Sequence, residues 1–231
     1  MNDTVVVITG AFGALGSAVA NAAAEQGRRT ALLDIATPPA TLHVLDPTRT
    51  LVVGSTDVAS PSAARSAMAA VNDRFGRIDA LINIAGGFRW QTIQDGDPQT
   101  WDELYRLNVT STLNASIACL PYLRRAKAGR IVNIGAAAAL KAGAGMGAYA
   151  AAKSAVHRLT ESLADELKAE GITVNAVLPS IIDTPANRKD MPDADRSKWV
   201  APAELASVIL FLASDAASAL TGALIPVTGR G

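Results

Sequence analysis

The feature that most constrains the fold is a regular alternation between short aliphatic runs and longer alanine-rich segments. Each short run is rich in valine, isoleucine or leucine, as buried strands are, and most of the segments between them have helical patterns. Strands that alternate with helices form right-handed βαβ units, which build a parallel sheet with helices on both faces. We therefore expect an α/β fold with one Rossmann-type, doubly wound sheet of about seven strands, at residues 4–9, 30–35, 51–54, 78–84, 130–134, 172–178 and 223–227.

The length of 231 residues suits one domain, and because no repeat or linker divides the chain we expect a single domain over residues 1–231. Two stretches interrupt the alternation. Residues 36–50 contain three prolines and predict a surface excursion, with room for one extra short strand. Residues 179–202 predict a long loop with a short helical piece, and since such loops are often lids, we expect a substrate lid around 180–200.

The composition favours a small-molecule partner over a nucleic acid or a membrane. The 21 basic side chains equal the 21 acidic ones, and no basic run stands out. The N-terminus lacks a basic leader segment, and no uncharged apolar run approaches the roughly 20 residues that cross a bilayer. The single Cys119 excludes an internal disulfide, so we expect a soluble cytoplasmic protein. With only two histidines we expect no metal, and we assign no role to His43.

Three glycines stand between the first expected strand and the helix that follows it, at positions 10, 13 and 16. Glycines at such a turn let the backbone approach a pyrophosphate, while the helix N-terminus offers free N–H groups and the positive end of its dipole. The alternative is a plain tight turn. The position on the first βα turn of an α/β chain favours a dinucleotide site.

An acidic residue, Asp34, ends the second expected strand 18 residues beyond Gly16. In a dinucleotide site this is where the adenosine ribose lies, and a carboxylate there accepts hydrogen bonds from both ribose hydroxyls. A 2′-phosphate would meet like charge, so we expect NAD(H) to be preferred over NADP(H). Arg28 and Arg29 precede the strand and are not expected to compensate a phosphate. A solvated aspartate at a strand end is the alternative.

Tyr149 and Lys153 are four residues apart in an alanine-rich helical segment, so both leave the same face of the helix. A nearby ammonium favours the phenolate and lowers the tyrosine pKa from about 10 toward neutrality, which makes the phenol a general acid or base. A solvated helix face is the alternative interpretation of this pair.

These motifs together resemble the short-chain dehydrogenase/reductase family over essentially the whole chain. The turn from Thr9 to Gly16 resembles its cofactor loop, residues 83–86 its Asn-Asn-Ala-Gly motif with Ile84 in place of the second asparagine, and residues 149–153 its Tyr-x-x-x-Lys pair. Leu107-Asn108-Val109 matches the helix that carries the catalytic asparagine of the family.

The resemblance implies a role for each matched residue. Tyr149 would be the proton donor, Lys153 would hold the nicotinamide ribose and lower the tyrosine pKa, and Asn108 would support a proton-relay water. It also implies a homodimer or homotetramer. The implied cofactor-binding residues, besides Tyr149 and Lys153, are Gly10, Phe12, Gly13, Ala14, Leu15, Gly16, Asp34, Asp57, Val58, Asn83, Ala85, Gly86, Pro179, Ile182 and Thr184.

One position departs from the family pattern. The family usually has a serine 13 residues before the tyrosine, but this chain has Ala136 there, next to Gly135. Alanine cannot donate a hydrogen bond to a substrate carbonyl, and loss of one such donor costs about 10²- to 10³-fold in rate in other enzymes. Either another group supplies that bond, or the substrate does not need it.

A dihydropteridine reductase-like branch of the family keeps the Tyr-Lys pair and also has alanine at this position. Residues 85–88, Ala-Gly-Gly-Phe, resemble its Ala-Gly-Gly-Trp, and residues 178–195 resemble its substrate-side loop. Asn108 follows the general family instead. The absent serine therefore suggests hydride transfer from NADH to a conjugated, cyclic acceptor of the quinonoid dihydropterin type.

Three aromatic residues are candidates for the substrate side. Phe88 and Trp90 follow the fourth expected strand, where they either stack on a flat substrate ring or pack within a loop. Trp199 either closes over the same pocket or anchors the lid to the body. His157, four residues past Lys153, is interpreted as a packed or interface histidine.

Two other functions stay open. One is a 3-oxoacyl or ketone carbonyl reductase, or an alcohol dehydrogenase, in which another donor replaces the serine. The other is a non-catalytic NAD(H)-sensing module.

Overall fold

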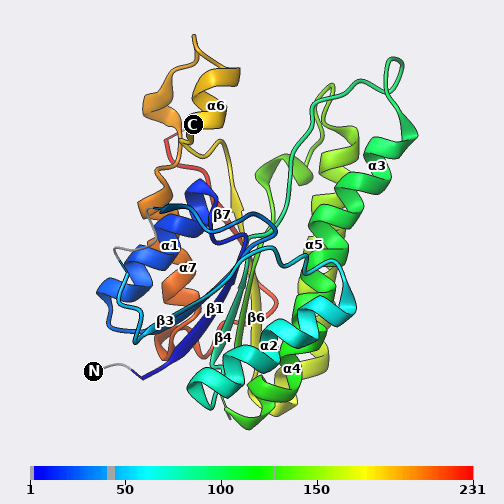
Figure 1. Ribbon diagram of the computed structural model, residues 1–231. Helices are drawn as coiled ribbons and strands as arrows, with labels where there is room; N and C mark the ends of the chain where they lie inside the picture. The colour runs from blue at the N-terminus through cyan, green and yellow to red at the C-terminus, as the bar shows by residue number, and fades with distance from the viewer. Residues whose placement is uncertain (1–2, 41–44, 127, 231) are drawn as a thin grey trace.

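The computed structural model describes residues 3–40, 45–126 and 128–230, and His43 lies outside them. Its centre is a seven-stranded sheet in which all paired strands are parallel, in the order β3-β2-β1-β4-β5-β6-β7 (Figure 1). All seven expected strands are confirmed, within two residues at each end. The strands are β1 (Val5–Thr9), β2 (Arg29–Leu33), β3 (Thr50–Val53), β4 (Ala80–Asn83), β5 (Arg130–Ile134), β6 (Thr173–Pro179) and β7 (Leu224–Val227).

Helices cover both faces of the sheet, as the alternation predicts (Figure 1). Helices α1 (Ala14–Glu25) and α7 (Pro202–Leu212) pack together on one face. The other face is covered by α2 (Pro61–Phe75), α4 (Ser111–Arg125) and α5 (Gly147–Leu167). Because side chains of the central strands point alternately to the two faces, two large cores form, one under each helical layer. A third, smaller cluster joins Leu104 and Val109 to α5. Among the described residues, no helix combines the length and the apolar composition needed to cross a membrane.

Two shorter helices lie beyond the carboxyl ends of the strands. Helix α3 (Pro98–Tyr105) begins at Asp97, whose side chain accepts a hydrogen bond from the Gln99 N–H, with proline in the first turn. Helix α6 (Pro185–Asp190) begins in the same way at Thr184, which accepts a hydrogen bond from the Asn187 N–H. These local caps explain why short segments are helical here.

A turn of π-helix, Arg106–Thr110, joins α3 to α4. Such turns are rare and are frequently found at functional sites, because the extra residue shifts the side chains that follow. This one contains Asn108, which is fully buried. The widened turn therefore sets where the asparagine lies relative to the sheet.

The two irregular stretches have the expected character. In the described parts of residues 36–50, no strand precedes β3. Residues 180–200 contain α6 and a single bridge between Ile182 and Val200. Arg188 and Asp183 form a bidentate ion pair inside this stretch, at 2.5 and 2.7 Å. Residues 180–200 thus form a loop with a short helix, and the ion pair within the loop stabilises it.

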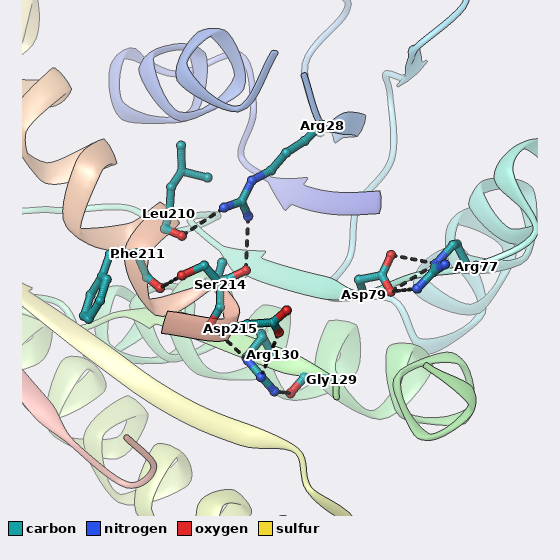
Figure 2. A network of polar contacts seen from close by, with 10 residues as sticks. Arg28, Arg77, Asp79, Gly129, Arg130, Leu210, Phe211, Ser214 and Asp215 are labelled. Carbon is teal, nitrogen blue, oxygen red and sulfur yellow. Dashed lines mark hydrogen bonds and ion pairs between the residues drawn. The ribbon is translucent and has the colours of Figure 1, made fainter. Parts of the chain in front are cut away.

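Two buried arginines hold α7 against the amino-terminal edge of the sheet (Figure 2). Arg28, 6% exposed, donates hydrogen bonds to the carbonyl oxygens of Leu210 and Ala213 at 3.2 and 3.1 Å. Arg130 contacts Asp215 at 3.3 Å just beyond the same helix end. Cations at a helix C-terminus offset the negative end of the dipole and satisfy its last carbonyl groups.

We predict that Arg28→Met lowers the free energy of unfolding by about 2 kcal/mol, because two carbonyl groups lose charged donors in a buried place. The matched control is Arg29→Met. Arg29 forms an ion pair with Asp3, whose side chain is 64% exposed, and the control should cost less than about 1 kcal/mol. Urea unfolding measures both values. Equal losses for the two variants would show that Arg28 does not anchor α7.

Candidate functional site

The glycine turn after β1 has the geometry that a close backbone approach requires. Gly10 has a φ of +65°, and a Cβ placed on it would lie 2.7 Å from the backbone nitrogen of Ala85. A Cβ on Gly16 would overlap the Gly10 carbonyl oxygen. Both glycines therefore allow the turn to pack tightly against β4 and α1.

The middle glycine serves a different purpose. A Cβ on Gly13 would meet only the Gly10 carbonyl, at 3.6 Å, so the space above it is open. Gly13 is also the N-cap residue of α1, where no described side chain caps the helix. The first turn of α1 thus presents its N–H groups and positive dipole end to an open surface, which suits a pyrophosphate.

A cleft of about 710 Å³ runs along the carboxyl ends of the first four strands. It brings together most of the residues for which a cofactor role was expected. These are Gly10, Phe12, Gly13, Ala14, Leu15, Gly16, Asp34, Asp57, Val58, Ala85, Gly86 and Thr184. Sequence reasoning missed Leu107 and Ser111, which lie one residue before and three after Asn108, and Pro185 and Ala186, which follow Thr184 in α6.

Asp34 lies at one side of this cleft, at the end of β2. Its carboxylate accepts hydrogen bonds from the backbone N–H groups of Phe12 and Ala36, both at 2.9 Å. The side chain is therefore held next to the glycine turn. Arg28 and Arg29 lie at the opposite end of β2, as expected, and Arg28 is committed to α7.

Asp57 lies farther along the cleft, after β3. One carboxylate oxygen accepts a hydrogen bond from the Ala59 N–H at 2.9 Å, and the other forms an ion pair with Arg106. Arg106 opens the π-turn, so this ion pair joins the cleft to the segment that carries Asn108. The Arg106 contact was not expected from the sequence, because 49 residues separate the two partners.

Three of the residues expected to bind the cofactor, Asn83, Pro179 and Ile182, do not line this cleft. The side chain of Asn83 is buried and donates hydrogen bonds to Asn133 at 2.9 Å and to Ser116 at 3.2 Å, so it links β4, β5 and α4 and does not face the cleft. Pro179 is buried at the end of β6. Ile182 pairs with Val200. Neither of these two is among the residues that line the cleft.

Tyr149 and Lys153 leave the same side of α5, near the end of β5. Lys153 is 6% exposed, and its ammonium donates a hydrogen bond to the carbonyl oxygen of Ile134 at 2.7 Å. A Cβ on Gly86 would lie 3.5 Å from the Lys153 Nζ, so the lysine reaches the wall of the cleft. The phenol ring of Tyr149 contacts Phe88 edge to face, with ring centroids 5.0 Å apart.

The expected direction of the Tyr149 pKa is wrong for the protein without cofactor. Burial raises the pKa of Tyr149 to about 12, because a phenolate is poorly solvated there. Burial also lowers the pKa of Lys153 to about 8, from an ordinary value of 10.5. Burial is the cause of both shifts, and Tyr149 carries its proton at neutral pH.

Asn108 is held by the main chain. Its amide nitrogen donates to the carbonyl oxygens of Gly87 and Leu104, at 3.0 and 2.9 Å, and its Oδ1 accepts from the Gly87 N–H at 3.3 Å. Its own carbonyl oxygen accepts a hydrogen bond from Thr112 at 2.8 Å. The side chain thus clamps the segment after β4, beside the Tyr-Lys pair.

The substrate-side candidates separate into two groups. Phe88 is 51% exposed and Trp90 is 63% exposed, and the indole N–H of Trp90 donates to the Ala144 carbonyl at 3.1 Å, in the loop that leads to Tyr149. Ala136 is buried after β5, with its N–H directed to His157. Trp199 is only 8% exposed and lines a different cavity with Val208 and Val227. Of the two interpretations of Trp199, this buried position fits a hydrophobic anchor better than a residue that closes over the pocket.

No group of three or more histidine, cysteine, aspartate or glutamate side chains is placed to hold a metal ion within the described residues.

Comparisons with known proteins agree with this geometry. Residues 4–195 match the family model described as short chain dehydrogenase. The D-beta-hydroxybutyrate dehydrogenase of Rhizobium meliloti (strain 1021) is 31% identical over 96% of each chain. The 3-oxoacyl-[acyl-carrier-protein] reductase FabG of Vibrio cholerae is also 31% identical, over 99% of this chain and 97% of its own.

A solved structure of a short-chain type dehydrogenase/reductase from Mycobacterium ulcerans superposes on the whole chain and on 90% of its own length, with a TM-score of 0.91 and 27% identity. The glycine turn and Asp34 line the cleft at the carboxyl ends of the strands, and Lys153 lies behind its wall at Gly86. The chain belongs to the short-chain dehydrogenase family.

Proposed function

We propose that the chain transfers hydride between NAD(H) and a small conjugated or carbonyl acceptor, with Tyr149 as the proton donor. The proposal rests on the position of Tyr149 and Lys153 on one side of α5, where Lys153 reaches the wall of the cleft. The glycine turn in this cleft is open above Gly13. The nicotinamide supplies or accepts the hydride when the cofactor is bound.

The residues of the cleft fit a dinucleotide. The open turn at Gly13 and the uncapped start of α1 suit the pyrophosphate, and Asp34 suits the ribose hydroxyls. Among the described residues that line the cleft, Asp34 and Asp57 are the charged ones. A 2′-phosphate would therefore meet negative charge, which supports a preference for NAD(H) over NADP(H).

Tyr149 has the protonation state that reduction requires. Its raised pKa keeps the phenol protonated at neutral pH, so it donates a proton as the acceptor gains hydride. The Lys153 ammonium, held by the Ile134 carbonyl, favours the phenolate that this transfer leaves behind.

The walls beside Tyr149 favour a flat acceptor. Phe88 touches the phenol ring, Trp90 lies in the neighbouring loop, and both rings are more than half exposed, so they offer stacking surfaces. Ala136 offers the acceptor no hydroxyl, and its N–H is already directed to His157. A conjugated ring with its own polar edge depends less on such a donor, and quinonoid dihydropterin is the probe of this class.

A second candidate is reduction of a 3-oxoacyl group or a ketone, or the reverse oxidation of an alcohol. The names of the relatives from Vibrio cholerae and Rhizobium meliloti favour it. In that case another donor replaces the absent serine and polarises the carbonyl oxygen together with Tyr149.

We further propose a cytoplasmic homodimer or homotetramer. The sole cysteine, Cys119, is buried and reduced, which suits the cytosol. Exposed apolar side chains on α3 and α4, such as Trp101 and Ile117, suit contact with another subunit.

The proposed activity is tested by NADH oxidation with quinonoid dihydropterin, beside a panel of small ketones and a 3-oxoacyl thioester. We predict turnover of at least one acceptor. Tyr149→Phe should lower kcat by at least about 100-fold, since general acid catalysis contributes 10²- to 10⁴-fold, while NADH still binds.

The pattern of turnover separates the candidates. Pterin turnover favours the conjugated acceptor, and turnover of ketones or the thioester alone favours the second candidate. Tight NADH binding without turnover of any acceptor would contradict both and indicate an NAD(H)-sensing module.

The buried lysine predicts a pH dependence of stability. Lys153 has a pKa of about 8 in the folded protein and an ordinary value of 10.5, so between these pH values the unfolded chain binds more protons. The free energy of unfolding of the native chain, measured relative to that of Lys153→Met, should therefore rise with pH across this window, by about 3 kcal/mol in total. Urea unfolding of both proteins between pH 7.5 and 10.5 measures it, and parallel stability curves would show that burial does not shift this lysine.

A further inference from the structure

His157 is a buried, titratable side chain that the proposed reaction does not use. It lies on α5 one turn beyond Lys153 and is 2% exposed. Its Nε2 accepts a hydrogen bond from the backbone N–H of Ala136 at 3.3 Å. A ring nitrogen accepts only when it carries no proton, so the bond requires a neutral imidazole with its proton on Nδ1.

The surroundings of the ring favour this neutral form. Burial, and then the positive charges of Arg158 and Lys153, lower the pKa of His157 below its ordinary value. Both charged groups belong to α5, and the segments packed on the ring from the sheet, at Gly135 and Leu178, carry no charge. His157 therefore stays neutral at pH 7.

Gly135 shows how closely the ring and the strand end fit together. A Cβ on Gly135 would lie 2.5 Å from the His157 Nε2 and 3.1 Å from the Leu178 Cδ1. Any larger residue at position 135 would displace the imidazole. The absence of a side chain at Gly135 thus leaves the space that the His157 ring occupies.

Two residues of α5 consequently hold the end of β5 and the segment just beyond it. Lys153 donates to the carbonyl oxygen of Ile134, at 2.7 Å, and His157 accepts from the N–H of Ala136. The lysine and the histidine lie one helical turn apart, so the two bonds restrain residues 134–136 at both ends. Ala136, at the position next to the proposed acceptor, is fixed by the second bond.

We propose that His157 is a positioning residue of the active site, which fixes residues 134–136 so that Ile134 holds the Lys153 ammonium and Ala136, where the family usually has a serine, keeps its place. The role rests on the proposed function. The role has a consequence at position 136. Alanine offers no hydroxyl there, and the backbone N–H is bound to the imidazole and does not serve the acceptor.

The test compares His157→Leu with His157→Gln, using the acceptor that the native chain turns over best. Leucine fills the space without an acceptor atom, whereas the glutamine Oε1 can take the place of Nε2. We expect kcat to fall about tenfold in His157→Leu, since a buried N–H loses its partner, and to stay within about threefold in His157→Gln. Ser154→Ala, which removes a hydrogen bond from α5 to the Ala139 carbonyl, is the matched control and should change kcat less than about twofold.

A pH profile separates positioning from general stability. In the native chain, protonation of His157 in acid breaks the Ala136 bond and lowers kcat, whereas glutamine does not titrate. His157→Gln should therefore keep its activity to lower pH. Full activity of His157→Leu, or equal losses in both variants with the native pH profile, would overturn the proposal.

Nitrogen NMR of the imidazole provides a readout that needs no activity. His43→Gln leaves His157 as the only histidine of the chain. We expect the Nδ1–H tautomer at pH 7, and a proton on Nε2 would overturn the proposal even if His157→Leu fails to fold. An inactive native chain with the expected tautomer would instead contradict the proposed function, and with it this role in catalysis.

Discussion

The site depends on one constraint of the sheet, which is that β1 pairs with β2 on one side and with β4 on the other. The chain leaves β1, runs outward to β3 and returns to the opposite side of β1, so the connections diverge at its carboxyl end. A crevice must form at such a point. Here the glycine turn lies in its middle, Asp34 on one side and Ala85 and Gly86 on the other.

The crevice stays open because its walls are tied to one another. Thr9 accepts hydrogen bonds from the N–H groups of Ile84 and Ala85, both at 3.2 Å, and Asp34 accepts one from Phe12. Each bond joins the carboxyl ends of neighbouring strands across the turn. These contacts leave the N-terminus of α1 free for a ligand, and the same edge of the sheet carries the helix that presents Tyr149.

At the chemical end, desolvation dominates the electrostatics. The pKa values of Tyr149 and Lys153 both shift toward the neutral forms when the cofactor is absent, since burial disfavours each charged form. The protein therefore holds a protonated phenol, and a lysine whose ammonium donates a hydrogen bond to the carbonyl at the end of β5.

The sequence predicted the fold and much of the cleft because those parts follow from local patterns. Aliphatic runs define the strands, and a glycine turn followed by a helix, with Asp34 at the next strand end, defines the crevice. Sequence patterns do not show how deeply a side chain is buried. Asn83 belongs to a familiar motif, yet its side chain bonds to Asn133 in the interior, and Trp199 is buried against the body of the protein.

The missed features are contacts between residues that are distant in the chain. The Asp57–Arg106 ion pair and the His157–Ala136 hydrogen bond depend on how helices lie on the sheet, which no local pattern encodes. The expected direction of the Tyr149 pKa shift was wrong because it also depends on the fold. Spacing on a helix shows which groups are neighbours, whereas the cost of their charges depends on how deeply the fold buries them.

The most direct test of the account is a comparison of NADH and NADPH affinity, from nicotinamide fluorescence, for the native chain and Asp34→Asn. Asparagine keeps an acceptor for the Phe12 N–H and removes the charge. We expect the native chain to bind NADH at least about tenfold more tightly than NADPH, and Asp34→Asn to lower this ratio of affinities by strengthening NADPH binding. Equal or tighter binding of NADPH by the native chain, or an unchanged ratio in Asp34→Asn, would contradict this expectation.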